Sequence, residues 1–136
     1  MIVKCKSSEW YMFSPKSVKE GHNIKTKYDE LEINQEYYVY SMILYEDGIR
    51  YLIYVDSEVP AFPLWYPAEL FEVSDNTLPD NWHYKFNGII DGAVSAIWGY
   101  EELVYSDSHF DGLGEQDVKD IDLFLKRKKE MCDKMY

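Results

Sequence analysis

"EYYVYSMILYEDGIRYLIYVDS", residues 36–57, is the stretch that decides the fold. Two runs rich in tyrosine and β-branched residues flank Asp47-Gly48, a dipeptide that favours a two-residue turn because both residues tolerate positive φ. The pattern predicts a β-hairpin in which Met42 faces Ile53. The face that carries this pair is apolar or aromatic throughout, so we expect it to pack on a core.

The opposite face of the predicted hairpin is mixed, with Ile43 and Leu52 as an apolar pair in its middle. A sheet that packs on one side only alternates to polar residues on the other side. We therefore expect another part of the chain, its carboxy-terminal segment, to cover Ile43 and Leu52.

The segments around the hairpin predict further short strands. Residues 1–6 alternate like a strand, and the polar segment 7–35 predicts a long irregular loop. Pro67 is expected to begin a 3₁₀ turn, followed by a strand at "LFEV", residues 70–73. The turn-forming cluster "SDNTLPDN", residues 74–81, marks an internal boundary.

The carboxy-terminal part predicts a second hairpin, a short helix, a loop and a long helix. The hairpin is expected from residues 82–88 and 93–99, and the short helix from residues 100–106. The loop is expected at residues 107–114 and the long helix at residues 115–134. On the last helix Val118, Ile121, Leu125 and Cys132 fall on one stripe, which we expect to be its buried face. Its acids come early and its bases late, in the order that the helix dipole favours.

The charge of the chain favours one class of partner. The formal net charge is −11, which repels nucleic acid and anionic membrane surfaces and attracts basic proteins. The same acidity is also explained by solubility alone. Cys5 and Cys132 lie at opposite ends of the chain without ligand spacing, and no segment has the length of a signal peptide or membrane span. We expect reduced cysteines and a cytoplasmic protein.

No pattern of catalytic or metal-binding residues is present in the sequence. His22, His83 and His109 are not at ligand spacing, and neither HExxH, G-x-S-x-G nor a Walker A lysine occurs. Asp107, His109 and Asp111 match the first positions of an EF-hand loop, but the twelfth position is Val118 where calcium requires glutamate. We expect no metal, no cofactor and no enzymatic activity.

A concentration of acids with aromatic residues among them is the main candidate for binding a protein. Eight acids and one base occur between Glu101 and Phe124. Charged residues that steer and aromatic residues that anchor are typical of protein-binding surfaces. A solvated face above core aromatics remains the alternative. The candidate partner-binding residues are Glu101, Glu102, Tyr105, Asp107, Phe110, Asp111, Glu115 and Asp117.

"FPLWYPAELFEV", residues 62–73, provides a second candidate surface. The order of a strand, a long loop, a hairpin and "YPAELF" resembles the SH3-like barrels, over about residues 1–75. In Src-homology-3 domains an aromatic residue and the proline after it help to bind proline-rich peptides, which implies that role for Tyr66 and Pro67. The alternative peptide-binding set is Tyr54, Trp65, Tyr66 and Pro67.

The layout "YLIYVDS", "YPAELFE" and "AIWGYEELV" is also similar to a family of small uncharacterised bacterial SH3-like-barrel proteins. This resemblance implies that an immunity protein of a toxin system is one function to expect.

We thus predict an α+β fold: an SH3-like β-barrel over residues 1–75, with a β-hairpin and helix extension over residues 76–136 that packs on it as one structural unit. The expected function is a non-catalytic, acidic protein-binding protein, such as an immunity protein that neutralises a basic toxin or nuclease. A peptide-binding SH3-like adaptor is the first alternative. A small enzyme with titratable residues around His83 or His109 is the second. The binding face and the oligomeric state stay open.

Overall fold

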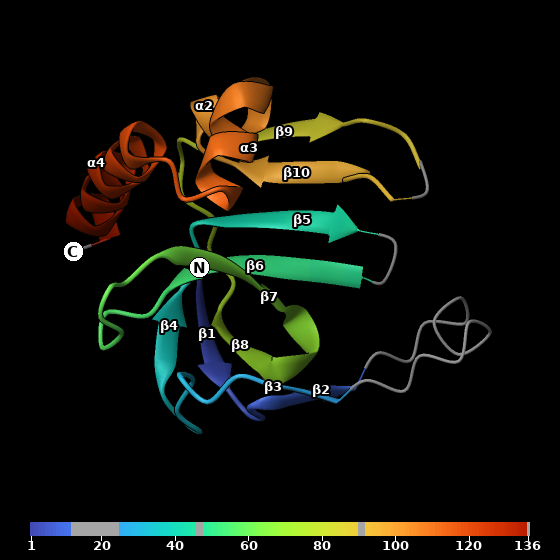
Figure 1. Ribbon diagram of the computed structural model, residues 1–136, viewed down its shortest axis with the longest axis vertical. Helices are drawn as coiled ribbons and strands as arrows, with labels where there is room; N and C mark the ends of the chain where they lie inside the picture. The colour runs from blue at the N-terminus through green and yellow to red at the C-terminus, as the bar shows by residue number, and fades with distance from the viewer. Residues whose placement is uncertain (12–24, 46–47, 90–91, 136) are drawn as a thin grey trace.

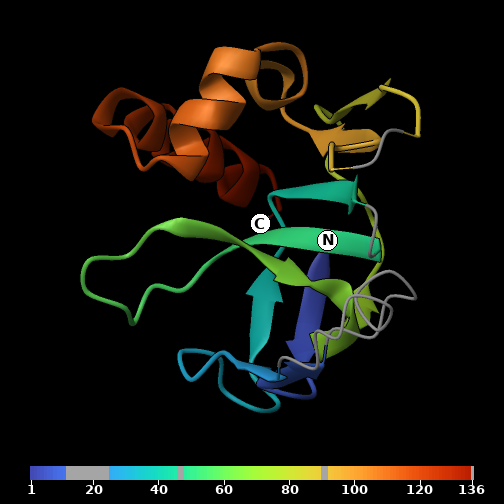
Figure 2. The same cartoon turned by 45° about the vertical axis from the view of Figure 1, so that its right-hand side comes forward.

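A computed structural model describes residues 1–11, 25–45, 48–89 and 92–135 and shows an α+β fold (Figure 1). Within these residues the chain forms two larger antiparallel sheets, one two-stranded ribbon and three α-helices. In Figures 1 and 2 the helices lie at one end of the molecule, the smaller sheet lies at the other end, and the larger sheet lies between them.

The smaller sheet has the strand order β4-β1-β8. Its central strand β1 (Ile2–Cys5) pairs with β4 (Glu36–Tyr38) on one side and with β8 (Phe71–Asp75) on the other. The predicted 3₁₀ turn is confirmed as η1 (Ala68–Leu70), which begins after Pro67 and leads into β8. Strands from both ends of residues 1–75 therefore meet in one sheet.

The segment 7–35 was predicted to be irregular, and this is wrong for two short strands. β2 (Glu9–Tyr11) pairs with β3 (Lys25–Lys27) as an antiparallel ribbon. The predicted loop between them, including His22, lies outside the described residues. A sequence this polar lacks the alternation that identifies a strand, so pattern alone does not find such a ribbon.

The larger sheet has the order β7-β6-β5-β10-β9. In chain order, its strands are β5 (Ser41–Tyr45), β6 (Gly48–Tyr54), β7 (Pro63–Pro67), β9 (His83–Phe86) and β10 (Ala96–Gly99). The second predicted hairpin is confirmed, because β9 and β10 pair with each other. β10 also pairs with β5, so this hairpin extends the sheet that the first hairpin begins.

The predicted register of the first hairpin is wrong by two residues. Met42 pairs with Tyr51 and not with Ile53, and Tyr45 pairs with Gly48. Gly48 has a φ of 124° and belongs to β6; Asp47, the other residue of the predicted turn, lies outside the described residues.

Because side chains alternate with a period of two, a shift of two residues leaves Met42 and Ile53 on one face and Ile43 and Leu52 on the other, as predicted. Tyr40, which precedes β5, was predicted on the face of Met42, and this is wrong, because it packs with Ile43 and Leu52.

Two hydrophobic clusters lie on opposite faces of the larger sheet. The first joins both larger sheets and contains Val3, Ile53 and Tyr66. The second contains Ile43 and Leu52 of the hairpin together with Phe124 and other residues of the helices. The carboxy-terminal part thus supplies the cover that the mixed face of the hairpin predicted.

The three helices follow β10 directly. The predicted short helix is confirmed as α2 (Glu101–Tyr105), and the predicted long helix as α4 (Val118–Met135). The loop predicted at residues 107–114 is wrong, since these residues form α3 (Asp107–Gly114). Ser106 caps this helix, because its Oγ accepts a hydrogen bond from the His109 amide at 3.2 Å.

The buried face of α4 also differs from the prediction. Val118 is 75% exposed and Leu125 is also exposed, whereas Asp120, Phe124 and Met131 are buried. The intervals of four and seven residues keep these three on one side of the helix. The prediction assumed that the buried face of the helix carries apolar residues only, and it misplaced that face because the buried residues include Asp120. The side chain of Cys132 lies outside the described part of the chain.

The α+β class of the chain is confirmed, whereas no sheet of the described residues closes on itself as a barrel would. Among the described residues no helix is both long and apolar enough to cross a membrane. Cys5 is buried and free, and burial raises the pKa of its thiol.

Candidate functional site

A buried hydrogen-bonded chain of three side chains holds the helices together. The Tyr100 hydroxyl lies 2.7 Å from Nε2 of His109, and Nδ1 of His109 lies 2.8 Å from Oδ1 of Asp120. All three residues are buried, and they come from the start of α2, from α3 and from α4. We call these residues the Tyr-His-Asp lock; Tyr100 is the residue just before α2, His109 lies in α3 and Asp120 in α4.

Each member of the lock has a hydrogen-bonding role open to it. Burial raises the pKa of Tyr100, so its hydroxyl keeps its proton and is able to donate to Nε2 of His109. The Asp120 carboxylate accepts from Nδ1–H. With both ring nitrogens occupied and only 3% of His109 exposed, this histidine orders the helices and is closed to a substrate.

Gly112 lets α3 and α4 approach closely at the lock. A Cβ atom at this position would overlap the Asp120 carboxylate. Glycine ordinarily lowers helix stability, so its place inside α3 is explained by this contact with α4.

A second polar contact links α2 to α4 at the surface. The Arg127 guanidinium donates to both carboxylate oxygens of Glu102, with distances of 2.6 Å and 3.0 Å, and also binds Glu130. Hydrogen bonds from Arg127 lower the pKa of Glu102. Glu102 was predicted as a partner-binding acid, but its carboxylate is already neutralised within the chain.

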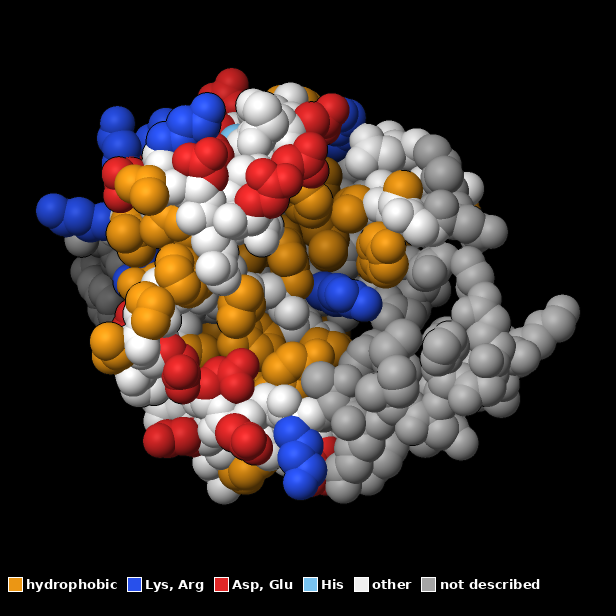
Figure 3. Space-filling view, viewed as in Figure 1, with side chains coloured by type: hydrophobic (Ala, Val, Ile, Leu, Met, Phe, Trp, Pro, Cys, Tyr) orange, Lys and Arg blue, Asp and Glu red, His pale blue; other side chains and the backbone are white. Residues whose placement is uncertain are grey.

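The other predicted acids are exposed on the surface of the helices that these contacts hold together. Asp107, Asp111 and Glu115 are exposed at intervals of four residues; Asp107 and Asp111 lie one turn apart in α3, and Glu115 is the residue that caps its carboxy-terminal end. Figure 3 shows acidic side chains gathering over α2 and α3. We call this set the acidic face; it consists of Glu101, Asp107, Asp111, Glu115 and Asp117, all of them exposed.

The two predicted aromatic anchors have different environments. Tyr105 is 56% exposed, and its ring contacts the ring of His83 with centroids 5.5 Å apart. Phe110 is half-buried, because its ring packs against Trp65 of β7 at 5.8 Å. Tyr105 is therefore available to a partner, whereas Phe110 attaches α3 to the sheet.

The alternative peptide-binding residues do not form an open surface. Tyr66 is 1% exposed, and its hydroxyl donates to Glu30 at 2.9 Å. Pro67 is buried as well, and Trp65 lies half-buried against Phe110. Tyr66 and Pro67, which were predicted to contact a peptide, are thus both interior side chains.

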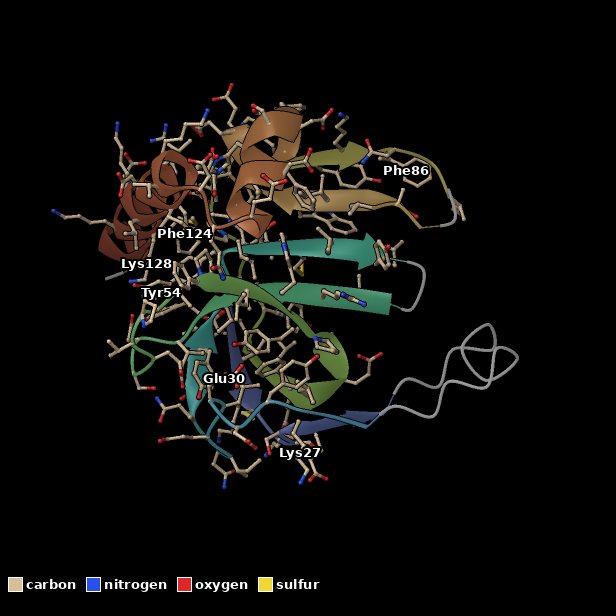
Figure 4. All side chains as sticks on the ribbon, in the orientation of Figure 1. Lys27, Glu30, Tyr54, Phe86, Phe124 and Lys128 are labelled. Atoms are coloured by element: carbon tan, nitrogen blue, oxygen red, sulfur yellow. The ribbon has the colours of Figure 1, made fainter. Side chains whose placement is uncertain are left out.

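Tyr54, the fourth member of that set, is half-buried beneath α4. Its ring lies 5.8 Å from the ring of Phe124, and the Lys128 ammonium lies 5.2 Å from its centroid. Figure 4 labels these three side chains close together between α4 and the sheet. The helices thus occupy the side of the sheet that carries Trp65 and Tyr54.

The two described histidines lie in different environments and do not form one site. His83 is exposed on β9, whereas His109 is enclosed in the lock. Within the described ranges no group of histidine, cysteine and acidic side chains is arranged to hold a metal ion. The EF-hand match at residue 107 fails in addition because that segment is helical.

A cavity of about 330 Å³ lies between the β9–β10 hairpin and the helices α2 and α3. Its floor is apolar and includes Ile97 and Val104, while Lys85, Asn87 and Asp107 contribute polar groups. His83 and His109 are not among its lining residues. The titratable cluster that the enzyme alternative requires is therefore not assembled around this cavity.

Comparison of the chain with protein-family models, with curated proteins and with solved structures finds no match. The candidate site consequently rests on the geometry of the chain itself.

Sequence reasoning missed the residues that organise this site. The sequence pattern places Asp120 and Arg127 in charged runs, and His109 in a loop. The available signal for Asp120 was its position four residues before Phe124, on the face that the helix buries. Nothing in the sequence indicates the contact between Phe110 and Trp65, which are distant along the chain.

Proposed function

We propose that this protein is a non-catalytic binding protein whose acidic face captures a basic protein partner. The observation that carries the proposal is the row of exposed carboxylates of Asp107 and Asp111 in α3 and of Glu115 at its carboxy-terminal cap. Within the described part of the chain, none of the three is neutralised by a basic side chain in the way that Arg127 neutralises Glu102. Like charges on successive turns lower helix stability, so a partner that neutralises them gains free energy.

The support beneath the acidic face suits a binding surface. The Tyr-His-Asp lock and the contact of Phe110 with Trp65 hold α3 against the rest of the molecule. A rigid surface loses little conformational entropy on association, which favours affinity. Tyr105, exposed beside the acids, supplies an aromatic side chain of the kind that often anchors a partner.

Net charge adds a kinetic advantage to this surface. With a formal net charge of −11, the chain attracts a basic protein over distances of about 10 Å at about 0.1 M salt and about 30 Å at about 0.01 M salt. Fast capture is what an immunity protein needs when it neutralises a basic toxin or nuclease. We therefore propose such an immunity protein, acting in the cytoplasm, as the biological role.

We also propose that residues 1–75 form an SH3-like barrel that is open at one side. This proposal is supported by the order of the elements along the chain, which is β1, β2, β3, β4, β5, β6, β7, η1 and β8. The last of these strands, β8, returns to pair with the first, β1. Both larger sheets share one core. In this interpretation the helices cover Tyr54 and Trp65, which disfavours the alternative of a peptide-binding adaptor.

The proposal is tested by quantitative capture from a lysate of the organism that carries the gene. Three immobilised proteins are compared: the wild type, the triple variant D107N/D111N/E115Q, and the matched variant D29N/E58Q/D80N. The matched residues are also exposed acids, so both variants lose the same charge. Proteins bound to each are quantified by mass spectrometry.

We expect one basic protein to be retained by the wild type and the matched variant, and to be lost from the α3 variant. Equal retention by all three proteins would show that binding does not use the acidic face. Equal loss of the captured protein from both variants would show that its binding depends on net charge alone, and would also contradict the proposal.

A further inference from the structure

A second concave surface lies away from the acidic face, between β4 and the segment that follows β6. It encloses about 390 Å³, and four of its ten lining residues are tyrosines. Tyr40 and Val55 are buried, and Tyr37, Tyr38 and Tyr54 are half-buried. Tyr38, Tyr40 and Tyr54 belong to the cluster beneath the helices, whereas Tyr37 belongs to the cluster that joins the two sheets. Three of the lining tyrosines therefore share one packed cluster.

Carboxylates stand at the opening of the same cavity. Glu32, Glu36 and Asp56 line it, and all three are exposed. One oxygen of Glu36 accepts a hydrogen bond from Ser74 at 2.9 Å. We therefore assign the binding of a ligand at the rim to Glu32 and Asp56. The cavity thus combines π-faces inside with negative charge at the rim.

This combination matches one ligand chemistry. The face of an aromatic ring attracts a cation through its quadrupole, and enclosure by several rings strengthens the attraction. Carboxylates at the rim add a charge-assisted hydrogen bond to an N–H donor. An alkyl chain that ends in an ammonium group fits both features, because its methylenes contact the rings while its charge reaches the rim.

The chain itself shows that these rings accept a lysine. The Nζ atom of Lys128 lies 5.2 Å from the centroid of Tyr54 and 5.9 Å from that of Tyr40. Lys128 approaches from α4 and does not line the cavity. Tyr37 and Tyr38 line the cavity as well.

We propose that this tyrosine–carboxylate pocket binds the side chain of a lysine presented by a partner protein. The ammonium lies among the tyrosine rings and the carboxylates of Glu32 and Asp56. Lys128 opposes this binding, because it places a like charge on two of the same rings. The proposal does not depend on the acidic face, which lies on other elements.

The test is a titration of the whole chain followed by NMR of its tyrosine ring resonances. The probe is Nα-acetyl-lysine methylamide, and the matched neutral probe is Nα-acetyl-norleucine methylamide, which keeps the four-carbon chain without the ammonium. We expect saturable shifts of pocket resonances with the lysine probe, at millimolar affinity, and no saturable shift with norleucine.

Two variants set the direction of the electrostatic effect. E32Q/D56N keeps the size of both rim side chains, and we expect it to weaken the lysine probe about three- to tenfold. K128M keeps the apolar stem over Tyr54 but removes the competing charge, and we expect tighter binding by about threefold. D80N, at an exposed acid that belongs to neither this pocket nor the acidic face, serves as the control and should bind like the wild type.

Three outcomes would overturn the proposal. They are equal shifts with norleucine, no shift of the pocket tyrosines up to the solubility limit of the lysine probe, and an affinity for lysine that E32Q/D56N leaves unchanged. Ring resonances that keep their wild-type dispersion in the unbound variants show that each variant is folded.

Discussion

Phe124 of α4 packs edge-on against Tyr40, with ring centroids 5.4 Å apart and an angle of 85° between the ring planes. Phe124 is fully buried, and one turn later Lys128 lies over the rings of Tyr40 and Tyr54. This contact joins the last helix to the sheet formed by the first hairpin. The helices that carry the acidic face therefore belong to the same packed unit as residues 1–75.

Phe124→Ala tests whether the helices and the sheet unfold together. Removing a buried phenylalanine leaves a cavity between them, so we expect the free energy of unfolding to fall by about 3–5 kcal/mol. Chemical denaturation followed by circular dichroism and by tyrosine fluorescence measures this change. Val118→Ala on the exposed side of α4 is the control and should cost less than about 0.5 kcal/mol. A helical signal that melts separately from the tyrosine signal in the wild type would contradict a single unit.

Asp120→Ala tests the Tyr-His-Asp lock. The change removes the acceptor of the His109 Nδ1–H and leaves that donor buried without a partner, which costs about 1–3 kcal/mol. Asp122→Ala is a matched control, since Asp122 is exposed on the same helix. Thermal unfolding compares the two variants. Equal midpoints would show that the buried chain of hydrogen bonds contributes nothing to stability.

The contact between Glu102 and Arg127 predicts a dependence of stability on pH. Because the folded state lowers the pKa of Glu102, the contact stabilises the fold above the pKa of the unfolded state and is lost as the pH falls through the folded value. We expect Glu102→Gln to destabilise the protein by about 1 kcal/mol at pH 7, a partly exposed pair being weaker than a buried one.

The difference between Glu102→Gln and the wild type should narrow as the pH falls below about 4, where the wild-type carboxyl becomes protonated. Urea unfolding at a series of pH values measures it. A difference that stays constant from about pH 7 to about pH 3 would mean that the charge of Glu102 is not what stabilises the contact. Glu101→Gln, an exposed neighbour on α2, is the control.

The faces of the fold were predictable because they depend on local alternation. Ile43 and Leu52 were apolar where a one-sided sheet should be polar, and the structure places helices over them. The register was less predictable, because Gly48 supports positive φ both in a turn and at the start of a strand. Side-chain alternation constrains the face and not the pairing.

The candidate site was predictable only in part for a related reason. Exposed acids such as Asp107 and Asp111 follow from composition, since charged residues without partners remain in solvent. α3 was missed because its glycines argue against a helix, while the contacts that stabilise it come from other elements, namely Asp120 at Gly112 and Trp65 at Phe110. Such tertiary contacts override local propensity and leave no local signal.

The most direct test of the proposed function is the association rate constant of the captured partner, measured by stopped flow from about 0.02 M to about 0.5 M salt, a range over which screening of surface charge becomes strong. The wild type, D107N/D111N/E115Q and the matched variant D29N/E58Q/D80N are compared.

We predict a rate that falls steeply with salt for the wild type and the matched variant, and a slower, nearly salt-independent rate for the α3 variant. Salt dependence of the same steepness in all three proteins would contradict the proposed function, because it would mean that the carboxylates of Asp107, Asp111 and Glu115 do not steer the partner.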